Sequence, residues 1–223
     1  EALGRPLRVV DMGCGKGYLT FAMHEHIRGE HGVPVLTQGV ELRKDLVAKT
    51  NQWAAELGLA PSATTGNAED ADKEKQSPGE SHGGATIGGG LRFVQGYISE
   101  ESGKLEEGTP DVLVALHACD TATDDAIYTG IRADAKVIIT APCCHKELRQ
   151  QFDKRAEKDF VIDDVLSHGI LRERTAEITT DGIRALLLEI AGYRTSVFEF
   201  VDGQHTAKNL MITALKRDRP LPA

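Results

Sequence analysis

Short apolar runs alternate along the chain with longer segments in which apolar residues recur at helical spacing. After a first strand that ends at Asp11, runs rich in β-branched residues predict strands at residues 35–40, 91–95, 111–116, 136–140, 195–201 and 210–215. The first five strands alternate with helical segments, which predicts a parallel sheet with right-handed crossovers. Residues 202–209 are too few for a crossover, so we expect the last two strands to form an antiparallel hairpin at the sheet edge.

The first strand runs into a glycine-rich turn with the sequence VVDMGCGKGY at residues 9–18. Gly13, Gly15 and Gly17 let the backbone turn sharply and approach a ligand where a side chain would collide. The free N–H groups at the start of the following helix point toward the same place. The D-x-G-x-G-x-G spacing differs from the dinucleotide fingerprint G-x-G-x-x-G, and Asp11 suits a cationic amino-acid tail better than a pyrophosphate.

A second acid, Glu41, follows the strand at residues 35–40. A carboxylate at a strand end can accept hydrogen bonds from both hydroxyls of a ribose. Strand, turn, helix, strand and terminal acid in this order predict a nucleoside site rather than an ordinary loop. The candidate residues for binding this nucleoside are Asp11, Gly13, Cys14, Gly15, Gly17, Tyr18, Glu41, Leu42, Gly96, Tyr97 and Leu116.

The motif DMGCGKG together with Glu41 resembles the first two motifs of the class I S-adenosylmethionine-dependent methyltransferases. The segments DVLVALHACDTATDDAI (residues 111–127), APCCHKEL (141–148) and HTAKN (205–209) resemble a subgroup that includes the eukaryotic tRNA 2′-O-methyltransferases of the acceptor stem and related bacterial proteins of undefined substrate. The resemblance implies an α/β, Rossmann-like seven-stranded methyltransferase sheet, mostly parallel with an antiparallel last strand and with helices on both faces. It also implies S-adenosyl-L-methionine as the cofactor.

Three functions are compatible with this sequence. The subgroup resemblance implies a methyltransferase that acts on RNA, at a ribose 2′-hydroxyl of tRNA in the narrowest reading. The acidic composition favours the same catalyst acting on a protein or a small molecule. A noncatalytic nucleoside-binding module is the third hypothesis, since a fold does not by itself establish catalysis.

The candidate catalytic residues follow strand ends, and the carboxyl ends of parallel strands are where open α/β sheets bind ligands. His117 is a candidate general base, although a buried histidine bonded to a backbone carbonyl is the alternative. Asp120 is a second candidate for base or orienter, with helix capping as the alternative. Cys143 and His145 complete the catalytic set, and we expect the target nucleophile to enter over them. The candidate substrate-binding residues are Cys119, Cys144, His205, Lys208 and Asn209.

Zinc accepts the ligand types found at His117, Cys119, Cys143, Cys144 and His145, and we expect the two loops that carry them to lie close together. However, the adjacent cysteines Cys143 and Cys144 lack the usual C-x-x-C spacing, and transfer from an electrophilic methyl carbon needs no Lewis acid. We therefore expect no metal here. The cysteines are expected to pack beside the methyl donor or to line the substrate cleft.

Length and composition predict one domain. The 223 residues, 40% of them hydrophobic, can form a sizeable core, and we assign a single domain to residues 1–217 with a tail at 218–223. Residues 61–90 are rich in glycine and charge, which predicts a flexible insertion. Because the chain opens at Glu1 without a methionine, we expect a further region before it.

The net charge and the positions of the cysteines restrict the kinds of partner and the cellular location that the sequence favours. The net charge of −8 disfavours a broad phosphate-binding surface but leaves room for a local basic patch. All four cysteines fall inside the proposed ligand motifs rather than at framework spacings, which predicts a reducing cytoplasm. No apolar run approaches the roughly 20 residues needed to span a membrane. We therefore expect no membrane partner, and the oligomeric state is left open.

The pattern of apolar and charged residues predicts the structure least clearly in the C-terminal third of the chain. Residues 168–174 and 179–182 are expected to precede an apolar helix around Leu186, with Asp181 as its cap. Charges at the spacing of Arg184 and its neighbours most often lie on a solvated helix face.

Overall fold

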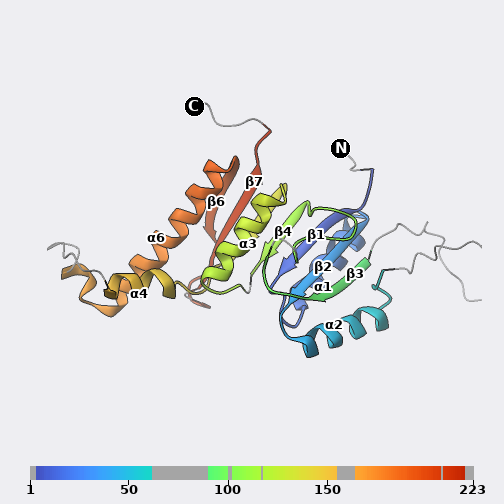
Figure 1. Ribbon diagram of the computed structural model, residues 1–223, viewed down its shortest axis with the longest axis horizontal. Helices are drawn as coiled ribbons and strands as arrows, with labels where there is room; N and C mark the ends of the chain where they lie inside the picture. Colours follow the sequence, from blue (N-terminus) through green and yellow to red (C-terminus); the bar gives the residue numbers. More distant parts are fainter. Residues whose placement is uncertain are drawn as a thin grey trace, which may run out of the picture.

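The computed structural model describes residues 4–61, 90–99, 102–116, 118–154, 164–206 and 208–218 (Figure 1). The strands are β1 (Leu7–Met12), β2 (Val35–Glu41), β3 (Gly90–Gln95), β4 (Val112–Ala115), β5 (Val137–Thr140), β6 (Tyr193–Glu199) and β7 (Leu210–Lys216). The helices in these ranges are α1 (Tyr18–Glu25), the π-helical η1 (His26–Glu30), α2 (Lys44–Glu56), α3 (Thr121–Arg132), α4 (Lys146–Lys154) and α6 (Gly169–Ile190).

One seven-stranded sheet has the order β3-β2-β1-β4-β5-β7-β6. Strands β1 to β5 are mutually parallel, and β7 runs antiparallel between β5 and β6. The predicted fold class and the terminal hairpin are therefore confirmed. The strand order reverses between β1 and β4, which is the place where open α/β sheets bind ligands.

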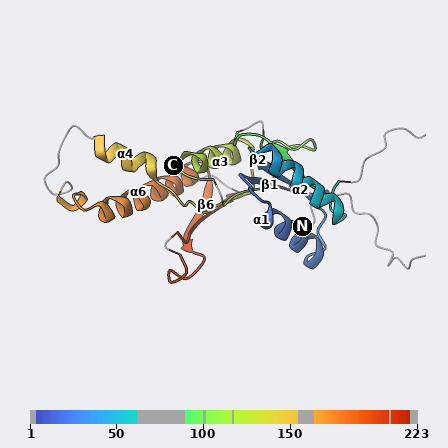
Figure 2. The same ribbon diagram turned by 90° about the horizontal axis from the view of Figure 1, so that it is seen from below.

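Helices cover both faces of the sheet, as Figure 2 shows with α1 on one side and α3 and α6 on the other. On one face, Met12 of β1 shares a buried apolar cluster with residues of α3 and with Leu188 of α6. On the opposite face, Phe93 of β3 packs with Phe21 of α1 and Val47 of α2. Because both faces are covered, β1 and β2 are buried along most of their length, as is typical of central parallel strands.

Two expectations for the C-terminal third are wrong. The helix α6 is continuous over Gly169–Ile190, so Asp181 lies inside it and does not cap a helix start. Arg184 is 3% exposed instead of solvated, because the carboxylates of Asp124 in α3 and Asp181 bind its guanidinium. Asp181 is the (i, i+3) neighbour of Arg184 on the same helix, but Asp124 comes from α3, so the local charge pattern could not reveal that second partner.

The other predicted elements differ in their boundaries or lie outside the described residues. Strand β6 begins at Tyr193, before the expected start at Thr195, since Tyr193 and Arg194 already pair with Lys216 and Leu215 of β7. The expected insertion at 61–90 and tail at 218–223 fall almost wholly on residues outside the described ranges. Within those ranges, no helix combines the length and apolarity that a membrane crossing requires.

Candidate active site

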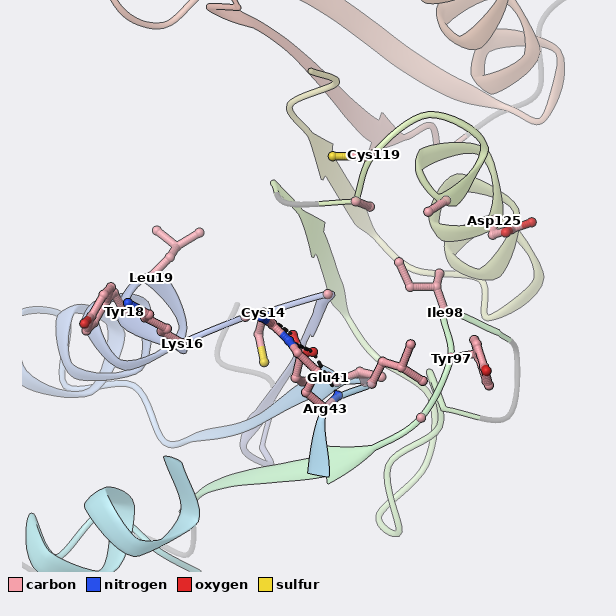
Figure 3. Close-up of a pocket in the computed structure, with 17 residues that line it drawn as sticks. Cys14, Lys16, Tyr18, Leu19, Glu41, Arg43, Tyr97, Ile98, Cys119 and Asp125 are labelled. Carbon is pink, nitrogen blue, oxygen red and sulfur yellow. Dashed lines mark hydrogen bonds and ion pairs between the residues drawn. The ribbon is translucent and has the colours of Figure 1, made fainter. Parts of the chain in front are cut away.

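A cavity of about 660 Å³ opens at the rim where β1 to β4 end (Figure 3). Its volume is typical of pockets that enclose small molecules, which measure about 300–1,000 Å³. The cavity lies where the strand order reverses. It is lined by Gly13, Cys14, Gly15, Lys16, Tyr18, Leu19, Val40, Glu41, Leu42, Arg43, Gly96, Tyr97, Ile98, Ala118, Cys119, Ala122 and Asp125.

The glycine-rich turn after β1 is fastened to the end of β2. The N–H groups of Gly13 and Cys14 donate to the carbonyl of Val40 at 2.9 and 3.0 Å. Gly17, the N-cap of α1, has a φ of +74°, and a Cβ at this position would lie 2.9 Å from the Phe93 ring. Glycine therefore permits both the turn that forms the cavity floor and the close packing of α1 against β3.

Glu41 presents an ionised carboxylate at the cavity wall. Its Oε1 accepts hydrogen bonds from the backbone N–H and the Nε of Arg43 at 3.0 and 2.9 Å. These bonds lower the pKa of Glu41 below its ordinary value, although partial burial opposes the shift. The carboxylate thus stays charged and able to accept further hydrogen bonds from a pair of ligand hydroxyls.

Apolar and aromatic side chains surround the same cavity. Tyr18, Leu42 and Tyr97 are 69%, 48% and 75% exposed, and all three line it. A planar aromatic ring can stack on these side chains. The cavity wall therefore favours a ligand that carries an aromatic base next to the hydroxyl groups that Glu41 can bind.

Eight of the eleven predicted nucleoside-binding residues line this cavity, and three do not. Asp11 is 1% exposed, and its Oδ2 accepts a hydrogen bond from Thr20 Oγ1 at 2.6 Å. This bond joins the end of β1 to α1 and so stabilises the glycine-rich turn between them. Gly17 and Leu116 are likewise absent from the wall. Ligand contacts of all eleven stay predictions.

Several wall residues are not among the candidates from the sequence: Lys16, Leu19, Val40, Arg43, Ile98, Ala118, Ala122 and Asp125. The sequence holds a signal for two of them. Ala122 and Asp125 are three residues apart in α3, a spacing that places both on one helix face.

The candidate base His117 lies outside the described residues. Asp120 has a φ of +56°, which a residue other than glycine rarely adopts. Its Oδ1 accepts a bond from the Glu147 N–H at 3.2 Å, and its carbonyl accepts one from Arg184 at 2.8 Å. Asp120 therefore caps the start of α4, not of its own helix, and holds an unusual backbone conformation at the rim.

Three thiols meet between the strand ends of β4 and β5. The Sγ atom of Cys119 lies 3.0 Å from that of Cys143, which lies 3.6 Å from the Sγ of Cys144. Burial, together with contacts from the two neighbouring thiols, raises the pKa of Cys143 to about 12. Cys119 also lines the cofactor-sized cavity, so the cluster reaches its wall.

His145 belongs to a buried polar network. Its Nε2 lies 3.0 Å from Asp181 Oδ1, and the same oxygen accepts a bond from Arg184 at 3.1 Å. The His145 Nδ1 has no hydrogen-bond partner among the described residues. In such a pair the carboxylate fixes the orientation of the imidazole ring.

A second cavity of about 380 Å³ adjoins this network. It is lined by Pro142, His145, Arg174, Glu177, Ile178, Asp181, Glu199, Gly203, Thr206, Lys208, Asn209 and Leu210. The loop between β6 and β7 and the turn after β5 therefore line the same cavity.

The three candidate residues in the hairpin loop have different surroundings. His205 is exposed. Lys208 forms an ion pair with Glu177 of α6. Asn209 is 5% exposed and donates to the carbonyl of Val201 at 2.8 Å, so it holds the loop closed.

Solved structures with the same fold share little sequence with this chain. The CMeT domain of the citrinin polyketide synthase is 16% identical with a TM-score of 0.51, and the match covers 98% of this chain and 48% of that one. A Listeria monocytogenes protein described as a class I S-adenosylmethionine-dependent methyltransferase is 11% identical with a TM-score of 0.52, over 98% and 56% of the two chains. The Methanococcus jannaschii fibrillarin pre-rRNA processing protein is 11% identical with a TM-score of 0.50, over 96% and 68%.

These similarities concern the fold alone, and this chain spans about half the length of the first two proteins. No curated protein matches the chain. A family model described as a methyltransferase domain matches residues 2–151, about two thirds of the sequence, including the glycine-rich turn, Glu41 and the thiol cluster. The ionised carboxylate of Glu41 fits the ribose of S-adenosyl-L-methionine, and the aromatic side chains of Tyr18 and Tyr97 fit its adenine. The volume of the cavity fits both groups together. The chain therefore belongs to the methyltransferase domain family.

Proposed function

We propose that this protein methylates RNA, with a ribose 2′-hydroxyl of tRNA as the first candidate acceptor. One observation carries the proposal: the segments at 111–127 and 141–148, which resemble the tRNA 2′-O-methyltransferase subgroup, adjoin the cofactor cavity through Cys119 and the thiol cluster. These segments would then form the acceptor side of the site, opposite Glu41.

The residues of the cavity suit the binding half of this reaction. S-adenosyl-L-methionine supplies an electrophilic methyl group on a sulfonium. Glu41 would hold the ribose hydroxyls, and Tyr97 and Leu42 would cover the adenine. Because methyl transfer is an in-line displacement, the protein contributes mainly by holding donor and acceptor in alignment.

The proton of the acceptor hydroxyl needs a base. His117 remains our first candidate because it lies two residues after the end of β4 in the sequence. His145 is the candidate with described geometry, since Asp181 orients its ring and the cavity at its side can receive an acceptor. Asp120 stays a third candidate, although its carboxylate already binds the start of α4.

One observation favours a different acceptor. The second cavity has acidic side chains from Glu177, Asp181 and Glu199 on its wall, against the cations of Arg174 and Lys208, and the whole chain carries a net charge of −8. Phosphates avoid such a surface unless cations outnumber the acids. A protein or small molecule with a cationic group is therefore the second candidate substrate.

The deciding experiment supplies methyl-labelled S-adenosyl-L-methionine to the protein together with separate pools of RNA, protein and small metabolites. We expect label in RNA, at linkages that resist alkaline hydrolysis because a 2′-O-methyl group removes the attacking hydroxyl. The Glu41→Gln variant serves as the control with weakened cofactor binding. Label confined to protein or metabolites would replace the RNA proposal with the second candidate.

Absence of label in every pool, together with measurable cofactor binding, would instead favour the noncatalytic module.

We also propose a cytoplasmic location, which the four free thiols support because a reducing compartment keeps thiols unpaired.

A further inference from the structure

The thiol cluster of Cys119, Cys143 and Cys144 is the most unusual group at the rim. Among the described residues, these are the side chains whose ligand atoms converge in the manner of a metal site, with all three Sγ atoms within 4.8 Å of one another. Cys143 and Cys144 are adjacent and lack the C-x-x-C spacing of many zinc sites. Cys119, from the end of the neighbouring strand β4, supplies a third sulfur beside them.

The sulfur positions suit a soft divalent cation. Zinc binds thiolate sulfur at about 2.3 Å, so a tetrahedral ion holds its sulfurs about 3.8 Å apart. The observed Sγ separations of 3.0 and 3.6 Å, and the upper limit of 4.8 Å for the cluster, differ from that spacing by about 1 Å or less. Side-chain rotations of this size need no rearrangement of the backbone.

The two loops that carry the thiols are held together by bonds other than the sulfur contacts. The N–H of Ala141 donates to Ala115 at 3.2 Å, and Asp120 accepts from the N–H of Glu147 at 3.2 Å. Thr123 Oγ1 further fixes the carbonyl of Ala118 at 2.6 Å. Bonds on both sides of the cluster keep the three ligands close before any ion arrives, which is the condition for a preformed site.

We propose that Cys119, Cys143 and Cys144 form a three-thiolate Zn²⁺ site in the wall of the cofactor cavity. On binding, the three thiols release three protons to solvent and the Zn²⁺ gains three Zn–S bonds. Cys119 is exposed and lines the cavity, so the fourth coordination position is reached from that side. Three protein ligands with an open position are the arrangement of zinc sites that bind an exchangeable ligand.

A disulfide is the competing interpretation. Cys119 and Cys143 lie 3.0 Å apart, whereas a disulfide bond measures about 2.05 Å. Forming it would need an oxidant to remove two electrons and two protons, and it would leave Cys144 without a role. The convergence of all three thiols favours the cation.

The test uses the whole chain, reduced and freed of metal with a chelator and then given Zn²⁺. We expect one Zn²⁺ per chain to survive desalting, measured by elemental analysis and by competition with a chromophoric chelator. Co²⁺ in place of Zn²⁺ should give a thiolate-to-metal charge-transfer band. The site does not depend on which acceptor the enzyme methylates, so this result and the labelling result are separate.

Cys119→Ser is the decisive variant because Cys119 is exposed, and its folding is checked by thermal unfolding. Loss of a direct ligand should weaken Zn²⁺ binding by more than the roughly 10–100-fold that loss of a supporting contact costs. Cys14→Ala is the matched control: it removes the remaining cysteine, which is buried in a separate apolar cluster, and should keep one Zn²⁺ per chain. Equal Zn²⁺ binding by the wild-type chain and Cys119→Ser would overturn the proposal, as would a Co²⁺ spectrum without the thiolate band.

Discussion

Glu41 is a mostly buried carboxylate that keeps its charge. Two hydrogen bonds from Arg43 to Oε1 and a longer one to Oε2, at 3.3 Å, offset the loss of solvent, and the carboxylate oxygens can accept further bonds from a ligand in the cavity. A charge in this position gives stronger hydrogen bonds to hydroxyl groups than a neutral amide can.

Replacing Glu41 with Gln keeps the shape of the side chain but removes the charge. We expect the affinity for S-adenosyl-L-methionine to fall roughly 10–100-fold, the equivalent of about 1.5–3 kcal/mol for hydrogen bonds to a charged group. Isothermal titration calorimetry measures the change. Glu56→Gln is the matched control, since Glu56 is exposed at the C-terminal end of α2, where its carboxylate accepts a hydrogen bond from Gln52. Unchanged affinity in Glu41→Gln would show that the ribose lies elsewhere.

At the scale of elements, the start of α1 decides how close the helix approaches the sheet. Gly17 combines a left-handed backbone with near contact to Phe93 of β3 and Thr50 of α2. The turn, the helix and the neighbouring strand therefore depend on one residue without a side chain.

Gly17→Ala should destabilise the protein by about 1–3 kcal/mol, because the added methyl group is strained at this φ and collides with the Phe93 ring. Gly182→Ala is the control: it lies in α6 with no atom within 4 Å of the added Cβ. It should stabilise the helix by up to about 1 kcal/mol. Urea unfolding measures both, and equal shifts in the two variants would contradict this account of the turn.

At the scale of the whole molecule, buried ionisable groups set the pH range of stability. Burial raises the pKa of Asp111, but the bonds from Arg5 and the Arg8 N–H lower it more, so the net shift is downward. Glu41 is also shifted downward by Arg43. Burial, aided by the charges of Asp11 and Glu41, raises the pKa of the Cys14 thiol to about 12.

These shifts predict a maximum of stability between mildly acidic and mildly alkaline pH. The two carboxylates stabilise the fold above their ordinary values of 3.8 and 4.5, and this contribution is lost as the pH falls through their lower folded-state values. The folded chain retains the Cys14 proton between pH 9.0 and about 12 while the unfolded chain loses it, so stability decreases as the pH rises through that window. Thermal unfolding across pH measures both limbs. Cys14→Ala should flatten the alkaline limb, and a Tm that rises from pH 9 to 11 would contradict the prediction.

Local sequence determined the fold and the cofactor half of the site. Apolar periodicity identified the strands, and the rule that parallel strands share a rim placed Glu41 and the glycine-rich turn together. These features depend on residues near each other in the chain or on general chain geometry. For this reason the sequence by itself predicted the sheet, its terminal hairpin and most of the cavity wall.

Only the tertiary structure decided which side chains meet across elements. The contact of Cys119 with Cys143, the pairing of His145 with Asp181 and the burial of Arg184 all join residues that are far apart in sequence or on different turns. Periodicity reports which face of an element is apolar, but it carries no information on the lateral distance between two elements. That distance is fixed by packing, and it turned scattered cysteines into a cluster and an apparently solvated arginine into a buried one.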